Sequence, residues 1–169
     1  MKRKITLILS ITVIAILCLF TFSINTKADS LPYSVEHSAV QVTVPNPILV
    51  NNTGTSVVDK NITLDSDWAT PYLGTISISN KNYYQIAKDE YILSDDVYHY
   101  VATSEIITVT SKVPAQLYTY DLKPIKNRML APNTSWYSDR TIGTNKLDGS
   151  GFYLRVATNE FVRFSDALF

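Results

Sequence analysis

Polar and apolar residues alternate along several short stretches of the chain. Residues 75–79 alternate with a period of two, which is typical of a strand with one buried face. A polar turn at 80–82 separates them from a second apolar stretch at 83–86, and a third follows at 90–93. Beyond residue 28, no stretch of ten residues shows an apolar stripe with the helical period. The pattern predicts an all-β protein built of short strands and turns.

The first residues form a different pattern. A basic start at 2–4 is followed by the uncharged, mainly apolar stretch 5–26 and by the small-x-small site 26–28. This order predicts a signal peptide at 1–28 and a mature chain that begins at Asp29. A retained transmembrane anchor is the alternative, because about 20 apolar residues would span a bilayer.

Two parts of the chain repeat one another. A shift of 68 residues aligns Trp68 with Trp136, and a shift of 70 aligns Tyr83 with Tyr153. The shift grows only in polar stretches, as expected when insertions fall in loops. We interpret the pattern as a tandem duplication.

The duplication divides the mature chain into four segments. We predict an N-terminal arm at 29–40, a first repeat at 41–97, a linker at 98–112 with the opening strand of the second repeat, and a second repeat at 113–169. Modules of about 50–60 residues lie near the lower limit for independent folding, so their aromatic residues are needed for the core. We therefore expect two tandem small barrel-like (SH3-like) β modules, with Trp68 and Trp136 as equivalent packing residues.

Charge and cysteine content narrow the functional classes. Removing the four basic residues of 1–28 leaves 11 Lys and Arg against 15 Asp and Glu, a net charge of −4. This balance excludes a globally basic nucleic-acid binder. The single cysteine, Cys18, lies in the predicted signal, so the mature chain has neither disulfides nor a thiolate metal site.

The second repeat resembles a known family. The resemblance lies in the segments 115–118, 127–130, 133–136, 152–162 and 165–166, in that order. They are similar to the SLAP domain, the cell-wall-attachment module of lactobacillar surface-layer proteins, and residues 41–97 resemble it more weakly. The resemblance implies a secreted protein held non-covalently on the wall of a Gram-positive bacterium. Its expected partners are teichoic acid or peptidoglycan and other surface-layer proteins; no cofactor, nucleic acid or membrane partner is expected.

An anionic wall polymer requires cations, and these are unevenly distributed. Residues 41–97 carry a net charge of −4, whereas residues 113–169 carry +2. Arg can bind phosphate with two hydrogen bonds, so we expect the second repeat to bind the polymer. The alternative is that these are ordinary solvated charges. The candidate ligand-binding residues are Lys123, Lys126, Arg128, Arg140, Lys146, Arg155, Arg163, Tyr118 and Tyr153.

Two other functional classes stay open. A small wall hydrolase could use the carboxylate pairs 89–90 or 95–96, but only His37 and His99 are available as imidazole bases. A surface-layer structural or adhesive protein that binds glycans is the other alternative. We expect a non-catalytic protein, because no plausible set of nucleophile, base and orienting group can be assembled.

Overall fold

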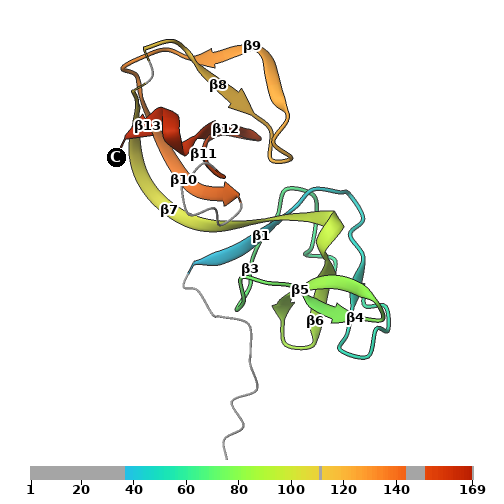
Figure 1. Ribbon diagram of the computed structural model, residues 1–169. Coiled ribbons are helices and arrows are strands. Elements are labelled where there is room, and N and C mark those ends of the chain that lie inside the picture. Colours follow the sequence, from blue (N-terminus) through green and yellow to red (C-terminus); the bar gives the residue numbers. More distant parts are fainter. Residues whose placement is uncertain (1–36, 111, 144–150, 169) are drawn as a thin grey trace, which may run out of the picture. The chain divides into compact units, whose positions relative to one another are not determined.

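The computed structural model describes residues 37–110, 112–143 and 151–168, and in these ranges the chain is all-β (Figure 1). The predicted fold class is therefore confirmed. Apart from strands, the regular elements among the described residues are two short 3₁₀ helices, η1 (Ser94–Asp96) and η2 (Phe164–Asp166). All of the described residues belong to one compact unit. The predicted signal peptide at 1–28 lies outside the described residues.

A four-stranded antiparallel sheet belongs to the first half of the chain. Its order is β2–β6–β5–β4. The bounds are β2 (Leu49–Val50), β4 (Ile76–Ile78), β5 (Lys81–Ala87) and β6 (Glu90–Leu93). The turn between β5 and β6 contains Asp89 in the left-handed region, with φ of 61°. The strand pattern predicted at 75–93 is thus confirmed as a run of hairpins.

A larger sheet continues into the second half. Its order is β3–β1–β7–β10–β11–β12–β8–β9, and β13 pairs with β7 off this path. The bounds are β1 (Ser38–Val42), β3 (Asp67–Ala69), β7 (Val97–Val109), β8 (Ala115–Tyr118), β9 (Pro124–Leu130), β10 (Ser135–Gly143), β11 (Phe152–Ala157), β12 (Glu160–Arg163) and β13 (Ala167–Leu168).

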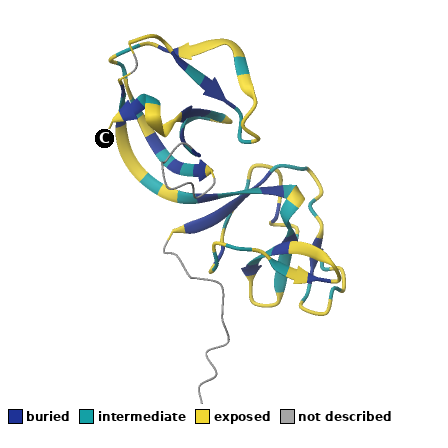
Figure 2. Cartoon of the chain, viewed as in Figure 1, coloured by how far each residue is buried: buried dark blue, intermediate teal, exposed yellow. Residues whose placement is uncertain are grey.

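Strands β7 and β1 cross two of the predicted segment boundaries. The expected linker at 98–112 is strand up to Val109, and β7 is a single strand of 13 residues. The opening strand expected at 106–110 is its second part. Strand β1 begins at Ser38, within the predicted N-terminal arm, and is buried along its whole length (Figure 2). Neither strand was predicted in full, because neither segment shows a strict alternation of polar and apolar residues.

The sheets do not close into barrels, and the barrel-like part of the prediction is wrong for the described residues. Strand β7 pairs with β1 and β13 along one edge and with β10 along the other. Because these partners come from both halves, β7 joins the halves in one open sheet instead of returning to close either one.

Both tryptophans pack against hydrophobic clusters, as predicted. Trp68 packs against the cluster around Val40 and Ile92, and Trp136 packs against the cluster around Ile107 and Leu154. The ring N–H of Trp68 donates to the Ser66 hydroxyl and that of Trp136 to the Thr134 hydroxyl, each at 2.8 Å. Each ring thus pairs its only polar atom two residues back along the chain.

The environments of the two tryptophans share further contacts. Trp68 lies opposite Val40 across β3 and β1, and Trp136 lies opposite Ile107 across β10 and β7. Two backbone N–H···O=C hydrogen bonds of the first half have counterparts in the second. They are Val42 to Ser66 and Val109 to Thr134, and Thr43 to Asp96 and Thr110 to Asp166, at 2.9–3.0 Å.

Candidate functional site

Arg140 is the centre of a buried polar network. Its side chain comes from β10 and is only 4% exposed. Its guanidinium donates to both carboxylate oxygens of Asp67, at 2.9 and 3.2 Å, and to the amide oxygen of Gln41 at 3.2 Å. The same group lies 4.0 Å from the centre of the Tyr100 ring and donates to the Tyr98 hydroxyl at 3.1 Å. The network joins residues that are far apart in the sequence.

A second carboxylate completes the network. Asp139 accepts hydrogen bonds from Arg140 at 3.3 Å and from Nε of Arg155 at 2.7 Å. Burial by itself would raise the pKa of Asp139, but the hydrogen bonds and charges of Arg155 and Arg140 outweigh it and hold this pKa below its usual value. Burial raises the pKa of Tyr100 to about 12, although the charge of Arg140 opposes the shift.

These contacts change the interpretation of two candidate residues. Arg140 was predicted to face an anionic ligand, but it is buried and paired with Asp67 and Asp139. Arg155 is largely buried and paired with Asp139. Both cations are used within the protein, so Arg140 is removed from the candidate ligand-binding residues and Arg155 is a poor candidate.

The other candidate ligand-binding cations that the structure describes lie on the surface of the second half. Lys123, in the turn before β9, pairs with Asp121 at 2.7 Å, and Arg128 on β9 pairs with Glu160 at 2.8 Å. Lys126 is exposed on β9 and makes no ion pair with any described residue. Exposed ion pairs are weak and exchange readily, so Lys123 and Arg128 could still meet an external anion. Lys146 lies outside the described residues.

Arg163 contacts two tyrosine side chains. Its guanidinium lies 5.0 Å from the centre of the Tyr118 ring, and a hydrogen bond with Tyr153 raises its pKa. The two tyrosine rings pack edge to face at 5.2 Å and are themselves buried. They therefore position Arg163 rather than offer their ring faces to a ligand, as would have been needed for sugar stacking.

The first half has no comparable cation at this place. Arg163 lies opposite Tyr153 across β12 and β11, whereas Leu93 lies opposite Tyr83 across β6 and β5. Leu93 packs against the apolar cluster of Val50, Ile78 and Tyr83. The first half thus places an apolar side chain where the second half places a guanidinium.

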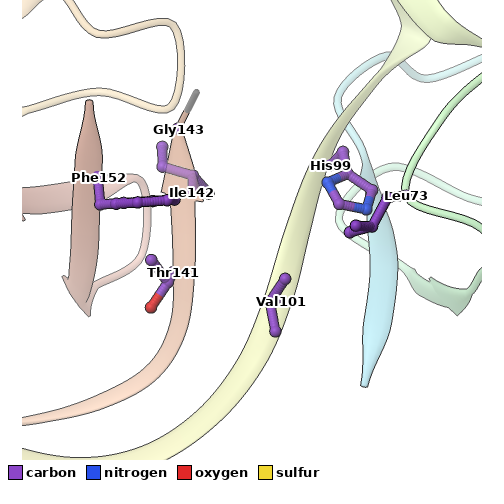
Figure 3. Close-up of a pocket in the computed structure, with 7 residues that line it drawn as sticks. All are labelled: Leu73, His99, Val101, Thr141, Ile142, Gly143 and Phe152. Carbon is purple, nitrogen blue, oxygen red and sulfur yellow. The ribbon is translucent and has the colours of Figure 1, made fainter. Parts of the chain in front are cut away.

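A pocket of about 360 Å³ lies beside His99 (Figure 3). Its lining is mainly apolar and includes Leu73 and Phe152. His99 Nε2 lies 2.7 Å from the hydroxyl of Ser38, and its ring stacks on Tyr84. Burial lowers the pKa of His99 and favours the neutral ring. This pair could not be predicted from the sequence, because Ser38 and His99 are 61 residues apart and come together only through the register of β1 and β7.

The carboxylates considered for hydrolysis stabilise loops. Asp89 accepts the backbone N–H of Asn52 at 2.8 Å, and Asp96 accepts that of Ile48 at 2.7 Å. Within the described ranges, no group of three or more His, Cys, Asp or Glu residues could hold a metal ion. Among the same residues, no helix has the length and apolar composition needed to cross a membrane.

Comparison with known proteins assigns a family to the first half. No curated protein matches the chain. The family model of the surface layer protein A domain matches residues 45–94, which include β2, β4, β5 and β6. The chain therefore carries a surface layer protein A domain at residues 45–94.

Proposed function

We propose that this chain is a secreted, non-catalytic protein that binds the cell wall of a Gram-positive bacterium without a covalent link. The observation that carries the proposal is the surface layer protein A domain at 45–94, which implies a protein of the cell surface. Export follows from the signal peptide expected at 1–28, so the intact mass of the exported protein should lack these residues. A mass that includes them would favour the membrane anchor instead.

We infer that the second half is another copy of the same domain, although the family model matches residues 45–94 of the first half, where the sequence resemblance was the weaker one. The equivalent tryptophans and the recurring hydrogen bonds of β1 and β7 support this relation. Loop attachments support it as well. Asp89 accepts the N–H of Asn52, and Asn159 accepts the N–H of Tyr120, both at 2.8 Å. Asp89 and Asn159, the two acceptors, both have positive φ.

The proposed ligand is teichoic acid or a related polyanion of the wall. Its binding surface is the anion-binding surface of the second half, which comprises Lys123, Lys126, Arg128 and Arg163. Arg163 is held by two tyrosines, and Lys126 has no ion pair with a described residue. Positive charge attracts the polyanion, whereas residues 41–97 of the first half carry a net charge of −4 and do not attract it.

Hydrolysis is the weaker proposal. Asp89 and Asp96 already accept backbone N–H groups, and Ser38 is buried beside a His99 that no described carboxylate orients. A nucleophile needs an accessible oxygen and an oriented base.

A wall-fraction assay tests the proposed function. Residues 29–169 should sediment with purified wall fragments and should sediment far less after anionic polymers are extracted from those fragments. The same protein in a zymogram of intact wall should produce no clearing. Clearing that disappears in Asp89→Asn or Glu90→Gln would establish a hydrolase instead, and unchanged sedimentation after extraction would point to peptidoglycan as the ligand.

A further inference from the structure

An uncharged face of the second half is left open to solvent. We call it the outer β7–β10 face; it comprises Ser104, Ile106, Thr108, Ser135, Tyr137 and Leu168. Tyr137 lies directly opposite Ile106, and Thr108 lies opposite both Ser135 and Leu168. Tyr137, Ile106 and Leu168 are 56%, 61% and 63% exposed. Three large apolar side chains therefore share one face of three adjacent strands, while Trp136 and Ile107 point into the core.

The fold itself does not require large residues here. In the first half, the cross-strand pair next to Trp68 and Val40 is Ala69 and Ala39. In the second half, the pair next to Trp136 and Ile107 is Tyr137 and Ile106. Ala39 is buried in a hydrophobic cluster with Tyr100, whereas Tyr137 and Ile106 are more than half exposed, so packing in the core does not explain the size of these two side chains. An exposed apolar patch on a soluble surface commonly marks a binding site.

The chemistry of this face suits an uncharged ligand with hydroxyl groups. None of its six side chains carries a charge, and four of them carry a hydroxyl. The Thr108 and Ser135 hydroxyls lie 3.0 Å apart, and the Ser104 and Tyr137 hydroxyls lie 3.4 Å apart. Each hydroxyl has one donor and two acceptor positions, so each pair keeps hydrogen-bonding capacity for a ligand.

We propose that the outer β7–β10 face binds a sugar ring of an uncharged hexose-based glycan. The apolar face of the sugar lies on the Tyr137 ring and the Ile106 side chain, and the sugar hydroxyls bond to Thr108, Ser135 and Ser104. A polyanion would gain nothing from a face without cations, so this site is separate from the anion-binding surface. The same face of a second copy of the chain would cover the apolar side chains but would satisfy less of the hydrogen-bonding capacity of the hydroxyls.

The test is a titration of residues 29–169, labelled with ¹⁵N, with oligosaccharides of β-linked glucose and of N-acetylglucosamine. Binding in the millimolar range should shift the backbone amides of Ile106, Thr108 and Tyr137, and added NaCl should not weaken it. Tyr137→Ala should lower the affinity about tenfold, since a stacking contact of about 1.4 kcal/mol is lost. Tyr137→Phe should retain most of it. Met129→Ala removes a side chain of similar exposure, 54%, on β9 and should change nothing.

Three results would overturn the proposal. The first is an absence of saturable binding to either sugar in the millimolar range. The second is equal affinity of Tyr137→Ala and the unmodified protein, with both folded by circular dichroism. The third is a dimer in analytical ultracentrifugation that Tyr137→Ala converts to a monomer, which would make the face a contact between copies. None of these results bears on polyanion binding, whose test uses other residues.

Discussion

Arg140 connects residues of both halves through one guanidinium. Changing Arg140 to Ala leaves Asp67 without its cation and removes the contact with Tyr100. Because Arg140 is buried but the side chain of Asp67 is 41% exposed, water can solvate the remaining carboxylate, and we expect a loss of about 2 kcal/mol in the free energy of unfolding from the lost charged hydrogen bonds. Arg140→Lys should recover only part of it, because lysine cannot bond both carboxylate oxygens.

Urea unfolding measures these differences. The matched control is Lys126→Ala, which removes an exposed cation and should change stability by less than about 0.5 kcal/mol. If Arg140→Ala costs no more than this control, the network does not stabilise the fold.

Asp139 makes stability depend on acidity. Its pKa is lower in the folded protein than the ordinary value of 3.8, because Arg155 and Arg140 stabilise the carboxylate against the effect of burial. Its contribution is therefore complete above that value and is lost as the pH falls through the lower folded pKa. Asp139→Asn should be less stable at neutral pH but should lose less stability between about pH 5 and about pH 2. The urea unfolding midpoints of both proteins across this pH range test the prediction. If the midpoints of the two proteins depend on pH in parallel, Asp139 does not cause the pH dependence.

At the scale of secondary-structure elements, the β5–β6 turn holds a neighbouring loop through Asp89. Asp89→Asn should be nearly neutral, because an amide oxygen can also accept the N–H of Asn52 and Asn tolerates positive φ. Asp89→Ala should cost about 1–2 kcal/mol, through the lost acceptor and the strained backbone. Thermal melts of the two variants provide the comparison. Equal costs would mean that the carboxylate charge, and not the acceptor oxygen, matters.

The sequence pattern was informative about hairpins and less so about long strands. Period-two alternation located β4, and the turns around the apolar stretches 83–86 and 90–93 located β5 and β6. Strand β7 was divided into linker and strand because its partners change along its length, from β1 to β13 on one edge, and its burial pattern changes with them. Barrel closure could not be predicted, since it depends on these non-local pairings.

The candidate site shows the same limit. Summed charge pointed to the second half, but the sum could not distinguish a paired cation from an unpaired one. Arg140 and Arg163 contribute equally to the charge of +2, yet one is buried against Asp67 and the other is exposed beside Tyr118. Pairs such as Arg140 with Asp67, 73 residues apart, arise from the fold alone.

For the whole molecule, β7 and the Arg140 network predict a single unfolding transition. Trp68 and Trp136 are the only tryptophans and report on different hydrophobic clusters. Trp68→Phe and Trp136→Phe each leave one reporter. In each variant, the urea midpoint from tryptophan fluorescence should coincide with that from far-ultraviolet circular dichroism. Separate midpoints in either variant would show that the halves unfold independently.

The proposed function requires that cations of the second half bind an anionic wall polymer. The most direct test is the affinity of residues 29–169 for wall fragments over a series of NaCl concentrations. We compare the unmodified protein with Lys126→Gln/Arg163→Gln and with the control Lys81→Gln/Lys88→Gln, which removes two exposed cations of the first half. Both double variants change the net charge equally, so only the position of the charge differs.

We predict that binding weakens steeply as the NaCl concentration rises. The Lys126/Arg163 variant should bind more weakly, and its slope of log affinity against log salt should be smaller by about two, one for each lost phosphate contact. The control should bind like the unmodified protein. Binding that does not respond to salt, or that falls equally in both double variants, would show that these cations of the second half do not hold the polymer.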